Sequence, residues 1–187
     1  MSSVKDSQTE TETKNASVNL EDCLRLFKQE ETLDEQNMLY CGKCKEHVQA
    51  IKTLEIFRVP RILIISLKRF KTSRYGINQH NNHKLDTHVE FPLEGLDMKP
   101  FVLNESQKTN GSLIYDCFAV SNHFGSQGYG HYTAFGKNYI TGKWYNFDDS
   151  SCTLLPETPS KLKKEIVTKA AYSLFYRLRE DDPPYAD

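Results

Sequence analysis

The sequence lacks the features that mark membrane, nucleic-acid-binding and secreted proteins. Its longest largely apolar run, Ile62 to Leu67, has six residues including one serine, whereas a helix that spans a bilayer needs about 20. It has no excess of one charge, because 24 basic residues face 25 acidic ones. It has five cysteines, whereas the disulfide frameworks of secreted proteins usually have an even number. The odd number fits a reducing compartment. We therefore expect no membrane or nucleic-acid partner, and a cytoplasmic or nuclear location.

The length of the chain predicts one folded domain between two tails. A chain of 187 residues is long enough for one domain with a core but short for two. Residues 1–17 are almost wholly polar or charged, so this stretch is expected to be a disordered N-terminal tail. Residues 181–187 read as a second disordered tail. The folded domain is then expected over residues 18–180.

Hydrophobic periodicity predicts a mixed fold with more strand than helix. A helical stripe begins at Leu20, with Asn19 as its cap, and is expected to end near Glu30. Even spacing predicts a strand from Val48 to Ile56, and the unbroken apolar run after Pro60 predicts a strand covered on both faces. A long polar loop should follow it. Further strand candidates, all aromatic or β-branched, are residues 113–123, 131–138, 143–149 and 171–179, with a short helix or basic loop before the last. This pattern indicates an α+β fold with a mostly antiparallel sheet.

A histidine and an aspartate are predicted to meet on one hairpin. If the four residues 139–142 form the turn, Asn138 opposes Lys143 and paired residue numbers sum to 281. His131 and Asp148 then share a face as diagonal neighbours, about 7–8 Å apart at the backbone. A carboxylate that orients an imidazole leaves its other nitrogen free to take a proton from a nucleophile. Asp149 should point to the other face, although a register slip of one residue would give it the role of Asp148.

The glycines before His131 favour a functional role for His131 and Asp148 over a structural one. A lone histidine and aspartate are more often structural, but three glycines in residues 125–130 allow a close backbone approach to a ligand. A flexible loop that leads into a rigid strand is a common way to mount a binding loop. His123 is either a second functional group or, more simply, a structural histidine.

A pair of cysteines has the spacing of one zinc-binding turn. Cys41 and Cys44 are three residues apart, as in half of a tetrahedral site, and Gly42 allows the tight turn. His47 is a candidate third ligand. A redox pair or two unconnected thiols are alternative readings of this spacing.

With these residues placed, the chain resembles the C-terminal part of a ubiquitin-specific protease catalytic domain, of the subgroup with a long insertion in that domain. Four segments carry the likeness, in the order found in the family, and it extends over residues 18–179. They are "PRILIISLKRF" (60–70), the histidine box "YDCFAVSNHFGSQGYGHYTAFGKN" (115–138), the acid box "KWYNFDDS" (143–150) and the final strand "AYSLFYRLR" (171–179).

The resemblance implies a papain-like cysteine protease fold, of which this chain would hold the palm and half of a zinc-ribbon finger region. It implies that His131 is the general base, Asp148 its orienting carboxylate and Asp149 an assisting acid. It further implies a structural zinc ion at Cys41 and Cys44, and no catalytic cofactor. The channel for the ubiquitin tail would be lined by Gly125, Gly128, Tyr129, Gly130 and Tyr132.

No segment matches the family's cysteine box, so three functions compete. The first is a deubiquitinase part that cleaves after the C-terminal glycine of ubiquitin only with the missing N-terminal half of the domain, and is inactive alone. Cys152 is a poor substitute nucleophile because it follows a strand and does not begin a helix. The second function is a non-catalytic module that binds ubiquitin and ubiquitinated proteins. The third possibility is that the chain has no function by itself because it does not fold alone, since the edges of its strands would be left unpaired.

Overall fold

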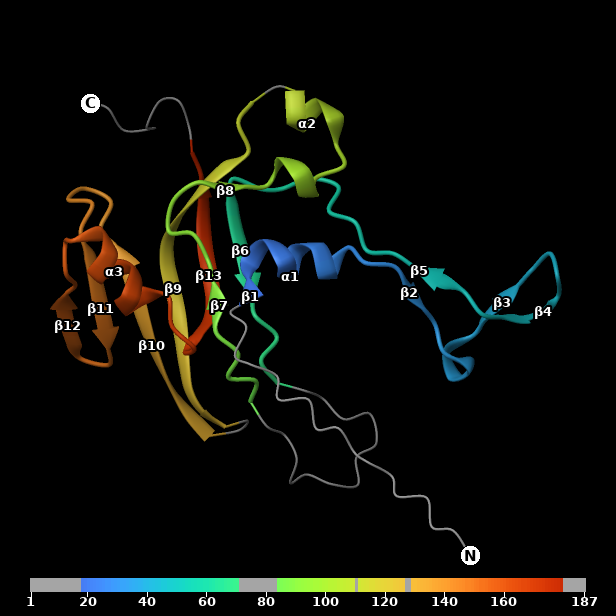
Figure 1. Cartoon of the computed structure of the whole chain (residues 1–187), viewed down its shortest axis with the longest axis horizontal. Helices are drawn as coiled ribbons and strands as arrows, with labels where there is room; N and C mark the ends of the chain where they lie inside the picture. The colour runs from blue at the N-terminus through green and yellow to red at the C-terminus, as the bar shows by residue number, and fades with distance from the viewer. Residues whose placement is uncertain (1–17, 71–83, 110, 127–128, 180–187) are drawn as a thin grey trace, which may run out of the picture.

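A computed structural model describes residues 18–70, 84–109, 111–126 and 129–179. Within these residues the main feature is a seven-stranded antiparallel sheet, ordered β12-β11-β10-β9-β13-β6, with β8 also paired to β9 (Figure 1). The expected mostly antiparallel fold with few helices is confirmed. The strands are β6 (Ile62–Ser66), β8 (Leu96–Asp97), β9 (Ile114–Ser126), β10 (Tyr129–Lys137), β11 (Trp144–Asp148), β12 (Ser151–Leu154) and β13 (Ala171–Leu178).

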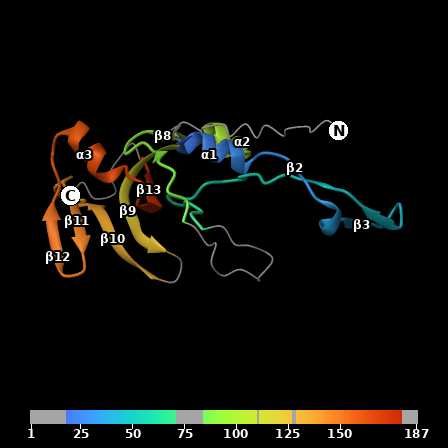
Figure 2. The ribbon, with the colours of Figure 1, turned by 60° about the horizontal axis from the view of Figure 1, so that its bottom comes forward.

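Short strands form an arm that extends away from this sheet in both views (Figures 1 and 2). Its two antiparallel pairs are β2 (Glu31–Thr32) with β5 (Ile51–Lys52), and β3 (Leu39–Cys41) with β4 (Glu46–Val48); η1 (Glu35–Asn37) lies between β2 and β3. The expected continuous strand from Val48 to Ile56 is therefore wrong. The chain changes pairing partner between β4 and β5, and Ile56 makes only an isolated bridge to Val102.

Helices pack on one side of the sheet and enclose the core. In Figure 2, α1 (Leu20–Phe27) and α3 (Pro159–Ile166) lie along the same side. Leu20 and Ile166 from these helices are buried in one cluster with Val120 of β9 and Leu174 of β13. Burial of several such side chains supplies the main driving force, at about 1.5–3 kcal/mol each. One face of the sheet thus packs against the helices through this buried cluster.

The first helix begins where the sequence predicts. The Asn19 side-chain oxygen accepts a hydrogen bond from the Asp22 amide at 2.8 Å, so the expected cap is confirmed. The helix ends at Phe27, about one turn before the expected end near Glu30, and Lys28 closes it. No helix in the described part of the chain is long and apolar enough to cross a membrane.

Strand β6 differs from the prediction that both of its faces are covered. It is an edge strand that pairs with β13, and Ile62 and Ile64 are 42% and 57% exposed. Leu63 and Ile65 pack against the core on the other face. Its outer apolar side chains stay in solvent because no element within the described residues packs on them. The segment 71–83, part of the expected long loop, the expected tails 1–17 and 181–187, and residue 180 lie outside the described residues.

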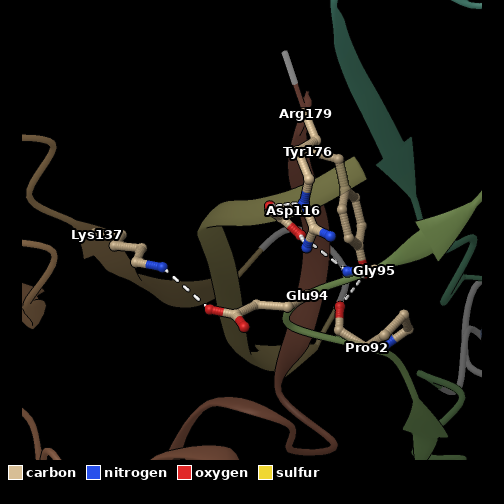
Figure 3. Close-up of polar contacts among 7 residues, drawn as sticks. All are labelled: Pro92, Glu94, Gly95, Asp116, Lys137, Tyr176 and Arg179. Carbon is tan, nitrogen blue, oxygen red and sulfur yellow. Dashed lines mark hydrogen bonds and ion pairs between the residues drawn. The ribbon is translucent and has the colours of Figure 1, made fainter. Parts of the chain in front are cut away.

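The connection between β7 (Val89–Glu90) and β8 is fixed to the sheet by polar contacts (Figure 3). The Tyr176 hydroxyl of β13 donates to the Pro92 carbonyl at 2.8 Å. The Asp116 carboxylate of β9 accepts from the Gly95 amide at 2.8 Å and from Nε of Arg179 at 2.9 Å. The remaining elements are β1 (Val18–Asn19), parallel to β7, then η3 (Lys99–Phe101) and α2 (Glu105–Thr109).

Candidate catalytic site

The hairpin of β10 and β11 has the predicted register. Phe135 opposes Asn146, so paired numbers sum to 281, and the Asn138 amide donates to the Lys143 carbonyl at 2.8 Å. The Asn138 side-chain oxygen accepts from the amides of Ile140 and Thr141 at 3.0 and 2.9 Å, which closes the turn. This tight turn fixes the pairing along the two strands.

His131 and Asp148 are in contact across this hairpin. Nε2 of His131 lies 2.6 Å from Oδ1 of Asp148, and both side chains are 47% exposed. The hydrogen bond to Asp148, followed by the charges of Asp148 and Asp149, raises the pKa of His131 above its usual value. Because Nε2 donates to the carboxylate, Nδ1 of the neutral ring carries a lone pair. The pair can therefore accept a proton at Nδ1 from an incoming group.

Asp149 does not point to the opposite face as predicted. It follows the last residue of β11 and has a φ of 47°, in the left-handed region that non-glycine residues rarely adopt. This turn brings its carboxylate to the same side: one ligand atom each from His131, Asp148 and Asp149 lie within 4.8 Å of one another. Asp149 thus adds negative charge beside the imidazole without a direct hydrogen bond to it within the described residues.

These three groups are arranged for proton transfer rather than for chelation. They form the one group of three potential metal ligands found within the described residues. Two ligands of a tetrahedral ion at about 2.1 Å lie about 3.4 Å apart, whereas Nε2 of His131 and Oδ1 of Asp148 are 2.6 Å apart. That distance fits a charge-assisted hydrogen bond.

The glycine-rich segment is a strand hairpin and not the expected flexible loop. β9 and β10 pair as far as Ser126 and Tyr129, with Gly130 opposite Gly125. Gly125 has a φ of 105°, which favours glycine. Of the other residues predicted to line a channel, Tyr129 and Tyr132 are 85% and 54% exposed, and Gly128 lies outside the described residues. The exposed tyrosines flank His131 in sequence.

No cysteine contacts the imidazole among the described residues, which include all five cysteines. Cys152 pairs with Phe147. Paired residues share a face and neighbours along a strand alternate, so Cys152 lies on the face opposite Asp148. Burial raises the pKa of the Cys117 thiol to about 12. The described residues thus bring an imidazole and two carboxylates together without a thiol beside them.

The turn that carries Cys41 and Cys44 directs backbone amides toward the Cys41 sulfur. Cys41 ends β3, and its sulfur accepts a hydrogen bond from the Cys44 amide at 3.5 Å. Backbone hydrogen bonds from Cys44 and Lys43 lower the pKa of the Cys41 thiol, as suits a thiolate ligand. His47, the candidate third ligand, pairs with Tyr40 and so lies on the other face of the hairpin from Cys41, which argues against that role. Its ring packs against Tyr40, with centroids 5.5 Å apart.

One polar residue beneath the pair had not been predicted to matter. Asn122 of β9 is fully buried, and its Nδ2 donates to Oγ1 of Thr133 at 3.2 Å. In the hairpin register Thr133 stands opposite Asp148. The sequence contained one indication of this role: Asn122 is a polar residue at a position of its strand where the alternation of side chains predicts burial.

In sequence, the chain is similar to curated ubiquitin carboxyl-terminal hydrolases. The family described as ubiquitin carboxyl-terminal hydrolase matches residues 5–176. Ubiquitin carboxyl-terminal hydrolase 4 of Pongo abelii is 48% identical over 169 residues, which cover 90% of this chain and 16% of the relative. Ubiquitin carboxyl-terminal hydrolase 15 of Homo sapiens is 47% identical over 164 residues, which cover 88% of this chain and 15% of the relative. The chain therefore spans about a sixth of the length of these relatives.

The fold is also similar to solved structures. A structure of the yeast SAGA DUB module aligns with a TM-score of 0.68 and 32% identity, over 88% of this chain and 34% of the other. The SAGA Ubp8/Sgf11/Sus1/Sgf73 DUB module bound to ubiquitin aldehyde aligns with a TM-score of 0.64 and 33% identity, over the same shares. The described sheet and arm thus correspond to about a third of those chains.

Proposed function

Because the chain belongs to the ubiquitin carboxyl-terminal hydrolase family of cysteine-type hydrolases, we propose that it is the part of a deubiquitinase that supplies base and acid. The observation that carries this proposal is the 2.6 Å contact of His131 with Asp148, which leaves Nδ1 for a thiol. His131 is then the general base, Asp148 orients it, and Asp149 adds negative charge beside it.

The nucleophile comes from another polypeptide segment, the N-terminal half of such a catalytic domain. Its thiol gives a proton to Nδ1 of His131, and the sulfur attacks the carbonyl carbon of the terminal glycine of ubiquitin. The leaving amine takes that proton as its bond to the carbonyl breaks. Water then hydrolyses the thioester with His131 again as base. Alone, this chain is inactive.

The same proposal assigns the remaining features of the chain. The seven-stranded sheet is the palm of a papain-like fold and the arm is half of a finger region. Gly125, Gly128, Tyr129, Gly130 and Tyr132 line the channel for the tail of ubiquitin, and the exposure of the two tyrosines supports this. One of the solved structures that share this fold, a SAGA DUB module, is bound to ubiquitin aldehyde.

Cys41 and Cys44 hold half of a structural zinc site in this proposal. A zinc ion there would tie the arm together, and the two other ligands would come from the N-terminal half. The hydrogen bond to the Cys41 sulfur and the lowered pKa of its thiol support this assignment. The ion takes no part in the proton transfers at His131.

The test is complementation in trans. The full 187-residue chain is mixed with the N-terminal half of a relative's catalytic domain, and cleavage of a reporter at the C-terminus of ubiquitin is measured. We expect turnover only in the mixture, and a loss of about 10²–10⁴-fold with His131→Ala, the usual contribution of a general base. Cys152→Ala is the matched control and should leave turnover unchanged. Turnover by the chain alone that Cys152→Ala abolishes would refute the proposal, and ubiquitin binding without turnover in the mixture would favour a non-catalytic module.

A further inference from the structure

A second histidine lies under the strand that carries His131. His123 of β9 is only 4% exposed and pairs with Tyr132 of β10. Because neighbours along a strand point to opposite faces, His123 and Tyr132 lie on the face opposite His131. The His123 ring is packed among three aromatic rings, with centroid distances of 4.7 Å to Tyr132, 5.8 Å to Tyr172 and 5.5 Å to Phe70.

Gly130 makes room for this ring. A Cβ atom built on Gly130 would lie 2.3 Å from Nε2 of His123 and 2.5 Å from the carbonyl oxygen of Phe124. The φ of Gly130 is outside the left-handed region, so its conformation does not require glycine. A glycine is needed at position 130 because the His123 imidazole and the Phe124 carbonyl occupy the space of a Cβ atom. His123 therefore lies directly against the backbone of the residue that precedes His131.

His131 is thus flanked by the two residues that His123 contacts. Gly130 precedes it and Tyr132 follows it, and both lie against the buried ring. His131 itself is about half exposed, so packing on its own face constrains it little. The backbone of His123 is in turn held by the ammonium group of Lys84, which donates to its carbonyl oxygen. The far side of the sheet thus supplies a buried support for the two residues that flank His131.

We propose that His123 is a positioning residue: its buried ring fixes Gly130 and Tyr132, and thereby holds the His131 imidazole against Asp148. The proposal rests on the role of His131 proposed above. Nδ1 of His123 is buried and has no hydrogen-bond partner in the part of the chain that the structure describes, so the shape of the ring matters more than its polarity. Burial, with the nearby charge of Lys84, lowers the pKa of His123 and so favours the neutral ring.

The test measures the pKa of His131 by NMR titration of the full chain, because this pKa reports on the contact with Asp148. His123→Ala should remove more than half of the upward shift that Asp148→Asn removes. His123→Phe keeps a ring in the same space and should retain the shift. Phe175→Ala is the matched control, since its ring contacts Phe118 on the same sheet face at 6.3 Å and should leave the shift unchanged.

A second pair of variants tests the contact from the other strand. Gly130→Ala puts a methyl group into the space of the His123 ring and should lower the pKa of His131 as His123→Ala does. Gly136→Ala is its control on the same strand and face, because the added Cβ meets only the Phe147 ring, at 3.2 Å. Equal pKa shifts in these two variants would contradict the proposal.

The outcomes separate the positioning role from the proposed function. If Asp148→Asn lowers the pKa of His131 and His123→Ala does not, the pair stands and the positioning role is refuted. If Asp148→Asn changes nothing, the pair itself and both proposals are refuted. Circular dichroism checks that each variant folds, and His123→Leu replaces His123→Ala if the latter does not. Failure of both variants to fold would make His123 a general stabilising residue and overturn the proposal.

Discussion

Replacing Thr133 by valine removes a hydroxyl that links β9 to β10 beneath the candidate site. Asn122 is fully buried and its Nδ2 donates to Oγ1 of Thr133 at 3.2 Å, while its Oδ1 has no partner among the residues that the structure describes. Valine has nearly the same shape as threonine, so the main effect is an Asn122 amide left wholly unpaired. An unpaired buried polar group costs about 1–3 kcal/mol. The free energy of unfolding should fall by about that amount, and the melting temperature by about 2–4 °C per kcal/mol.

The assay is urea unfolding followed by tryptophan fluorescence. Trp144, the single tryptophan of the chain, is buried in the adjacent strand β11 and reports on this part of the sheet. Thr133→Ser keeps the hydroxyl and should lose less stability than Thr133→Val. Thr153→Val, on the exposed strand β12, should be nearly neutral. A loss below about 0.5 kcal/mol in Thr133→Val, or one equal to that of Thr133→Ser, would show that the Thr133 hydroxyl does not stabilise the buried Asn122 amide.

Two further predictions concern the same fold. Tyr176→Phe removes the hydrogen bond to the Pro92 carbonyl and should lower the free energy of unfolding in urea by about 1 kcal/mol. Tyr172→Phe is the control and should be neutral, because the Tyr172 hydroxyl has no hydrogen bond within the described residues. Equal losses of stability in the two variants would contradict this prediction. Because the folded-state pKa of His131 is raised, its pair with Asp148 stabilises the fold fully below the usual histidine pKa of about 6.5, and this stabilisation is lost as pH rises through the raised value. Asp148→Asn should flatten that pH dependence in urea unfolding, and an unchanged pH profile would refute the contact.

The site geometry could be predicted where local rules decide it. Strand alternation and the four-residue turn after Asn138 fix the register, and the register alone brings His131 and Asp148 together. The orientation of Asp149 was predicted wrongly because the alternation of side chains along the strand ends at Asp148. The next residue adopts a left-handed backbone conformation, which the sequence does not predict. The predicted loop before His131 is a hairpin because glycines allow close pairing as readily as flexibility.

The environment of a strand is harder to predict than its existence. The apolar run at Ile62 was expected to be covered on both faces, yet Ile64 is exposed. An apolar pattern shows that a face suits burial but not that its partner lies within the same chain. The role of His123 could not be predicted either, because the rings around it come from segments far apart in the sequence.

The most direct test of the account is the tautomer of His131 in the full chain, read from the ¹⁵N chemical shifts of its ring at a pH above its pKa. We expect a proton on Nε2, donated to Asp148, and an unprotonated Nδ1 that can receive a proton from a thiol. A proton on Nδ1, or an Nε2 shift that Asp148→Asn leaves unchanged, would contradict it.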